Sequence, residues 1–106
     1  MSYDVTLVAE NSEGLFEDLY WRNHTRNTSQ MWRDAGCDIA EFHGKTAAEF
    51  AAALAPAIAD IEARPEHHEQ YVPDNKWGTV KTTLLFLHDL LDACNAHPDA
   101  TVEVDR

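Results

Sequence analysis

The sequence has few basic residues, few cysteines and no long apolar runs, and each shortage argues against a class of protein. Eight lysines and arginines stand against 19 acids, and the net charge of −11 opposes binding to nucleic acid or to an anionic membrane surface. No apolar run approaches the roughly 20 residues of a membrane span. The two cysteines, Cys37 and Cys94, are far apart, so they form no Cys-x-x-Cys motif. We expect both to be small buried apolar side chains.

The remaining composition is that of an ordinary folded domain. The 106 residues are 44% hydrophobic, which is too apolar for a disordered chain and sufficient for one core. We see no linker or repeat, so we expect a single domain over residues 1–106. The N-terminal residues Met1, Ser2, Tyr3 and Asp4 provide neither a basic region nor an apolar segment, so we expect a cytoplasmic protein.

Both ends of the chain have the two-residue period of a β-strand. Tyr3, Val5 and Leu7 alternate with other residues near the N-terminus, and Val102 and Val104 do so near the C-terminus. A lone strand needs a partner for its backbone groups. We therefore predict that residues 3–8 and 101–104 pair as an antiparallel ribbon.

Helical patterns occupy most of the chain between these strands. A short helix is expected from about Ser29 to a stop at Gly36, and a longer one from Thr46 to about residue 63. Pro56 lies inside the longer helix and is expected to kink or divide it. Residues 65–69 are expected to add a helical turn, and residues 80–94 carry the clearest apolar stripe. The predicted fold class is α+β, with three to four helices and the ribbon made by the two ends.

Two apolar features lie away from the expected core faces. Small side chains line one face of the longer helix at Ala48, Ala52, Ala55 and Ala59. Leu85 lies off the stripe of the last helix. Alanine is also simply a good helix former, but these positions could instead mediate self-association into a homodimer.

The densest polar stretch spans residues 21–29, and we interpret it as a loop that ends in a helix cap. Arginine, amide and hydroxyl groups beside tryptophan could hold an anionic or planar ligand. Alternatively, the same groups build turns and caps. The candidate binding residues are Trp21, Arg22, Asn23, His24, Thr25, Arg26 and Asn27.

Six histidines are many for this length, yet their spacing does not predict a metal site. His67 and His68 are adjacent, so on a helix we expect their side chains to diverge. The sequence also lacks a glycine-rich phosphate loop and a nucleophile placed beside a base. We therefore expect neither a metal, a cofactor nor catalytic residues, and the protein is expected not to be an enzyme.

Four motifs occur in an order that carries a resemblance. They are residues 21–32 with the Asn-His-Thr-x-Asn core at residues 23–27, residues 43–45 (His-Gly-Lys), residues 75–78 (Asn-Lys-Trp-Gly) and residues 97–101 (His-Pro-Asp-Ala-Thr). In this the chain resembles a group of small uncharacterised proteins encoded by actinobacteria and their bacteriophages. The resemblance implies an accessory gene of bacterial or phage origin and assigns no catalytic residue.

Together these features predict a non-enzymatic, phage-associated accessory protein that acts by protein–protein interaction. Its partner would be a host or phage protein, or a second copy of the chain. One alternative is a small-molecule or anion binder that uses residues 21–29. Another is an acidic DNA mimic, to which Glu62, Glu66 and Glu69 would contribute charge. Direct nucleic-acid binding and membrane binding are not expected.

Overall fold

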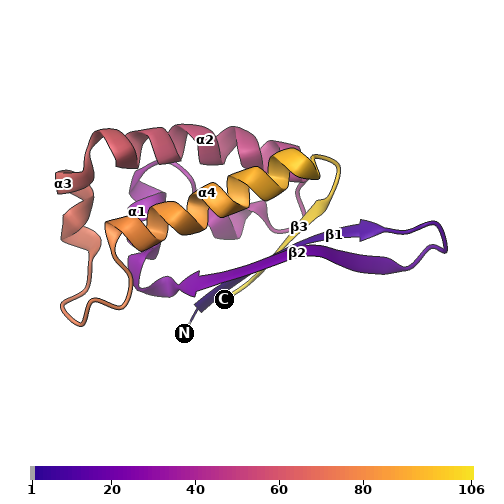
Figure 1. Ribbon diagram of the computed structural model, residues 1–106, viewed down its shortest axis with the longest axis horizontal. Helices are drawn as coiled ribbons and strands as arrows, with labels where there is room; N and C mark the ends of the chain where they lie inside the picture. Colours follow the sequence, from indigo (N-terminus) through magenta and orange to yellow (C-terminus); the bar gives the residue numbers. More distant parts are fainter. Residues whose placement is uncertain (1) are drawn as a thin grey trace.

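A three-stranded antiparallel sheet carries two long helices on one of its faces (Figure 1). The structure is a computed structural model and describes residues 2–106. The strands are β1 (Ser2–Glu10), β2 (Phe16–Thr25) and β3 (Thr101–Asp105). The α-helices are α1 (Ser29–Asp34), α2 (Ala47–Ala63), α3 (Pro65–His68) and α4 (Val80–Ala96), and three 3-10 turns are η1 (Arg26–Thr28), η2 (Ile39–Phe42) and η3 (Glu69–Tyr71). The predicted α+β class is confirmed.

The predicted pairing of the chain ends is also confirmed. β1 and β3 are antiparallel, with Val5 opposite Val104 and Leu7 opposite Val102. The two termini consequently lie side by side (Figure 1). These valines and Leu7 alternate with polar residues, so one face of the ribbon meets the helices and the other faces outward.

The sheet has a third strand that was not predicted from the sequence. Residues 21–25, predicted as part of a loop, belong to β2, which pairs with β1 in a hairpin. The register shifts in this hairpin, because Tyr20 lies opposite Leu7 while Asp18 lies opposite Val8. Leu19 is therefore an extra residue, a β-bulge that interrupts the alternation of side chains.

The two edges of the sheet differ. The outer edge of β3 is covered by residues 43–45: the Gly44 amide donates to the Val102 carbonyl over 2.8 Å, and the Val102 amide donates to the Lys45 carbonyl over 2.8 Å. The Val104 amide donates to Nδ1 of His43 over 2.9 Å. At the opposite edge, β2 pairs with β1 alone among residues 2–106.

Helix α2 begins where the predicted cap at Thr46 places it. The Thr46 hydroxyl accepts a hydrogen bond from the Glu49 amide over 3.2 Å and starts α2. The expectation that Pro56 divides this helix is wrong, since α2 is one helix through residue 63. Pro56 removes the amide that would bond to the Ala52 carbonyl, but both residues are exposed, so water can take that place.

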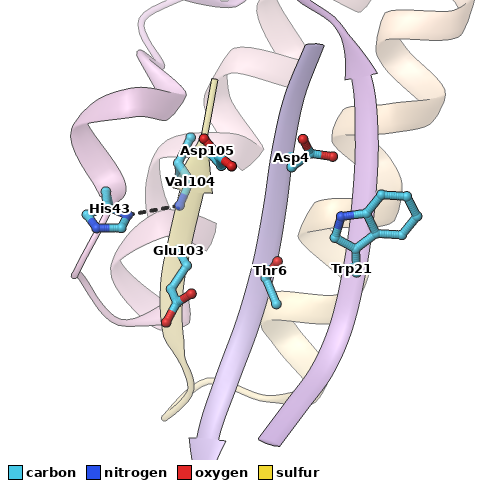
Figure 2. A pocket seen from close by; sticks show the side chains of 7 residues that line it. All are labelled: Asp4, Thr6, Trp21, His43, Glu103, Val104 and Asp105. Carbon is cyan, nitrogen blue, oxygen red and sulfur yellow. Dashed lines mark hydrogen bonds between the residues drawn. The ribbon is translucent and has the colours of Figure 1, made fainter. Parts of the chain in front are cut away.

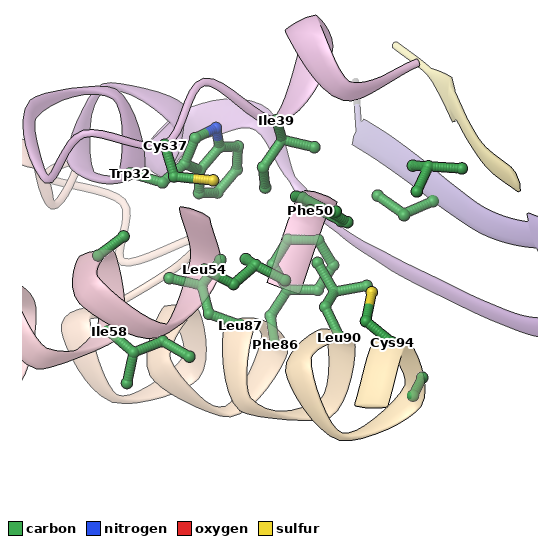
Figure 3. Close-up of a cluster of buried hydrophobic side chains, with 14 of the residues drawn as sticks. Trp32, Cys37, Ile39, Phe50, Leu54, Ile58, Phe86, Leu87, Leu90 and Cys94 are labelled. Atoms are coloured by element: carbon green, nitrogen blue, oxygen red, sulfur yellow. The ribbon is translucent and has the colours of Figure 1, made fainter. Parts of the chain in front are cut away.

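The core lies between α2, α4 and the inner face of the sheet (Figure 3). Helix α2 contributes Phe50 and Leu54, and α4 contributes Phe86 and Leu87, all fully buried. Trp32 from α1 closes the core at one end. Cys37 and Cys94 are buried and free, as predicted.

None of the helices within residues 2–106 is long and apolar enough to cross a membrane.

Candidate functional site

The predicted binding segment is divided between the two faces of the sheet. Successive side chains of a strand point to opposite faces. Trp21 is 60% exposed and lies on the outer face, beside Thr6 of β1 (Figure 2). Asn23, two residues further along β2, is exposed opposite Asp4. The intervening residue Arg22 turns toward α4.

Arg22 is engaged by helix α4. Its Nε donates to Oδ2 of Asp89 over 3.0 Å, and its guanidinium carbon lies 5.9 Å from the centroid of the Phe86 ring. These contacts pair the positive charge of Arg22 with Asp89 and place the guanidinium near the Phe86 ring. Arg22 thus bridges β2 and α4, and its side chain remains 36% exposed.

His24 lies on the same inner face as Arg22. Its ring stacks on Phe86 with centroids 4.9 Å apart, and its Nε2 lies 3.2 Å from the Thr28 hydroxyl and 3.3 Å from the Thr83 hydroxyl. Thr83 donates to Thr28 over 2.9 Å, so a short polar chain joins β2, η1 and α4. Burial, assisted by the Arg22 charge, lowers the pKa of His24 to about 4.

The end of the segment forms a turn. The Thr25 hydroxyl accepts a hydrogen bond from the Asn27 amide over 3.2 Å and caps η1. The side-chain cap predicted within residues 27–29 for the helix at Ser29 is not formed, because Thr28, the N-cap of α1, makes no such hydrogen bond. Arg26 and Asn27 are exposed. The seven candidate residues consequently do not surround one pocket.

The outer face of the sheet carries a hollow of about 520 Å³ (Figure 2). Of the predicted binding residues, only Trp21 lines it. The strands β1 and β3 and the residue that covers the β3 edge provide the rest. The lining residues are Asp4, Thr6, Trp21, His43, Glu103, Val104 and Asp105.

The strand register concentrates negative charge in this hollow. Asp4 lies directly opposite Asp105, and Thr6 separates Trp21 on one side from Glu103 on the other. None of the seven lining residues is lysine or arginine. Among residues 2–106, the three carboxylates take part in no salt bridge, so their charge is uncompensated by the fold.

This arrangement can hold a cation. Carboxylates bind ammonium and guanidinium groups, and a tryptophan ring is the best aromatic partner of a cation. The sequence pattern pointed to Trp21 but not to Asp4, Glu103 and Asp105. The sequence did contain a signal for these acids. They occupy the polar positions of the two terminal strands, and pairing of the strands places those positions on one face of the sheet.

The two predicted self-association surfaces are exposed. Ala48, Ala52, Ala55 and Ala59 face solvent on α2. Leu85 of α4 is 53% exposed and borders a shallow apolar depression with Val80 and Leu84. Their role in dimerisation stays a prediction.

The histidines of α3 do not diverge as predicted. The rings of His67 and His68 are 5.0 Å apart between centroids, and Asp34 of α1 lies against them. One ligand atom from each of the three residues lies within 4.8 Å of the others. The cysteines show no sign of activation, since burial raises the pKa of Cys37 to about 12 and that of Cys94 to about 11.

Comparisons with protein-family models, with curated proteins and with solved structures found no match to this chain.

Proposed function

We propose that the chain is a protein-binding module that takes up lysine or arginine side chains of a partner in the acidic hollow. The observation that carries this proposal is the pair of aspartates, Asp4 and Asp105, that face each other beside the exposed ring of Trp21. Like charges directly opposite each other on neighbouring strands are destabilising, by an amount on the order of 0.2–1 kcal/mol. A cation bound between them removes that repulsion.

The spacing of the acids suits an extended segment of the partner. Glu103 and Asp105 are two residues apart on β3, which separates their side chains by roughly 7 Å along the strand. An extended peptide with basic residues at alternate positions has the same repeat. The cations of the peptide would then lie over the acidic side chains of β1 and β3, and one cation would lie against the face of Trp21.

The contacts of Arg22 make the anion-binding alternative weaker. An anion site on the predicted segment would need this guanidinium, which already pairs with Asp89. The DNA-mimic alternative gains no specific support, because Glu62 is paired with His88 on the surface over 3.1 Å.

The proposal is tested with a defined peptide probe. A ten-residue peptide of alternating lysine and serine is titrated into the full-length chain, and binding is measured by calorimetry at low and at high salt. We expect binding that weakens with salt, because screening reduces the attraction between charges. Replacing Asp4, Glu103 and Asp105 with their amides should reduce affinity at least tenfold.

A charge-matched control separates this site from general attraction to an acidic protein. Replacing Glu66, Asp74 and Asp92 with their amides removes the same three charges from exposed positions elsewhere. We expect affinity to change by less than threefold in this control. Equal weakening in the two triple variants would show that net charge alone attracts the peptide, and the proposal would be abandoned.

The tryptophan provides a second variant. Trp21→Ala removes the aromatic face but no charge, so we expect affinity to fall roughly fivefold to thirtyfold, the equivalent of about 1–2 kcal/mol for a cation–π contact. Trp77→Ala, at another exposed tryptophan, is the matched control.

A further inference from the structure

Two imidazoles and a carboxylate converge where α1, α2 and α3 meet. Asp34 is the last residue of α1, and His67 and His68 lie in α3. Nε2 of His67 is 2.7 Å from Oδ2 of Asp34. The three residues offer ligand atoms that all lie within 4.8 Å of one another.

His68 has a nitrogen atom that the fold leaves unused. The side chain is fully buried, and its Nε2 lies 2.9 Å from Oδ2 of Asp60. A carboxylate only accepts hydrogen bonds, so Nε2 donates to Asp60, and the lone pair that can bind an ion is that of Nδ1. Nδ1 has no hydrogen-bond partner among residues 2–106. Buried polar atoms are rarely left without a partner, which points to a role for this lone pair.

The surroundings of His68 are those of a metal-binding histidine. Such a histidine binds the ion through one nitrogen and donates from the other to a carboxylate that fixes its orientation. Asp60 is that carboxylate here. It is itself held by Arg64, whose Nε and Nη2 donate to its two oxygens over 2.9 and 2.8 Å.

We propose that Asp34, His67 and His68 bind a divalent transition-metal ion of the zinc type. Two imidazole nitrogens and one carboxylate oxygen are ligands that zinc accepts, and three protein ligands leave a fourth position for water. Zinc would bind Nδ1 of His68, Oδ2 of Asp34 and Nε2 of His67. When the ion binds Nε2 of the neutral His67 ring, that nitrogen gives up its proton and Nδ1 takes one up through solvent. Gln70 Nε2 now lies 3.3 Å from Nδ1, so the Gln70 amide turns to present its oxygen to the new N–H group.

The geometry requires only small movements. In a tetrahedral zinc site, neighbouring ligand atoms lie roughly 3.3 Å apart, given bonds of about 2.0–2.1 Å. Here Nε2 of His67 lies 2.7 Å from Oδ2 of Asp34, and one ligand atom from each of the three residues, a ring nitrogen in the case of His68, lies within 4.8 Å of the others. The side chains of His67 and Asp34 are 36% and 31% exposed, so an ion can enter from solvent. The Arg64 guanidinium, 4.0 Å from Asp34, opposes a cation, but Asp34 and Asp60 together outweigh its charge.

The test uses the untagged, full-length chain, treated with chelator and then titrated with zinc chloride. Calorimetry should give one equivalent of bound zinc. Nitrogen NMR of the imidazoles in the unmodified protein should show the His68 Nδ1 and His67 Nε2 resonances shifting together to saturation. The resonances of His88 and His97 should stay in place. Because this measurement needs no variant, it decides the proposal even where a substitution prevents folding.

Variants then assign the ligands. We expect His67→Gln and Asp34→Asn each to reduce zinc affinity at least tenfold. Asp60→Asn, which alters only the orienting carboxylate, should reduce it by about 10- to 100-fold. His88→Gln is the matched control, because His88 also meets a carboxylate, Glu62, at the surface. It should leave affinity unchanged.

Three results would overturn the proposal. The first is the absence of saturable binding at one equivalent. The second is zinc binding that shifts the resonances of His88 and His97 as much as those of His67 and His68. The third is zinc binding that His88→Gln weakens as much as His67→Gln does. Zinc captured by the cysteines of unfolded chains would shift neither of the two histidine resonances and therefore counts against the site.

Discussion

His24 should make the stability of the fold sensitive to mild acid. Burial lowers the pKa of this imidazole to about 4, against an ordinary value of about 6.5. Between pH 6.5 and pH 4, His24 is therefore protonated in the unfolded chain but not in the folded chain. The unfolded state binds more protons in this window, so the free energy of unfolding falls as the pH falls from 6.5 toward 4.

The size of the effect follows from the two pKa values. At pH 5 the linkage relation gives a loss of about 2 kcal/mol for a fully shielded group. His24 is only partly buried, and solvent screening reduces this to about 1 kcal/mol. For a domain of this length, 1 kcal/mol corresponds to a fall in melting temperature of roughly 4–8 °C.

The assay compares melting curves of the wild-type chain and of His24→Gln at pH 7.5 and pH 5. The variant loses the stacking on Phe86 and is expected to be less stable at both pH values. The quantity to compare is the change in the free energy of unfolding between pH 7.5 and pH 5. The other titrating groups contribute equally to this change in both proteins. The wild-type chain should lose about 1 kcal/mol more than the variant. An equal loss in both proteins would refute the assignment of acid sensitivity to His24.

Three further predictions concern other parts of the fold. Asp105→Asn should raise the melting temperature by a few degrees, because it removes the repulsion between Asp4 and Asp105, which costs on the order of 0.2–1 kcal/mol. Calorimetry measures the melting temperature, and no rise would mean that this repulsion is already neutralised. Gly78→Ala should cost more stability than Gly36→Ala: both have positive φ, but only at Gly78 would the new Cβ lie 2.8 Å from Thr28. Denaturant unfolding measures the free energy of unfolding of both variants. Equal losses would show that the close approach of Gly78 to Thr28 does not affect stability. If the apolar depression on α4 mediates self-association, sedimentation should show a dimer that Leu85→Glu returns to monomer, whereas a wild-type monomer would exclude that surface.

The terminal strands and the long helices could be predicted because their patterns are local. Alternation at Tyr3, Val5 and Leu7 identifies β1, and the apolar stripe of α4 identifies its buried face. The pairing of the ends followed from the need of each lone strand for a partner. The cap at Thr46 is likewise encoded within four residues.

Strand β2 was missed because its pattern is interrupted. The bulge at Leu19 shifts the alternation, and the polar residues that follow have the composition of a loop. The acidic hollow depends on the register between β1 and β3, which pattern alone does not determine. The convergence of Asp34 with His67 depends on a contact between residues 33 positions apart. Spacing along the sequence contains no signal for such a contact.

The unequal edges of the sheet limit how copies of the chain can join through their backbones. Residues 43–45 already occupy hydrogen-bonding groups of β3, so within residues 2–106 the sheet edge that can accept another strand is that of β2. Two copies that pair β2 with β2 about a twofold axis leave no free edge in the resulting six-stranded sheet. Edge-to-edge growth of the native protein therefore stops at two subunits, and a continuous fibre would first require the contact at residues 43–45 to open.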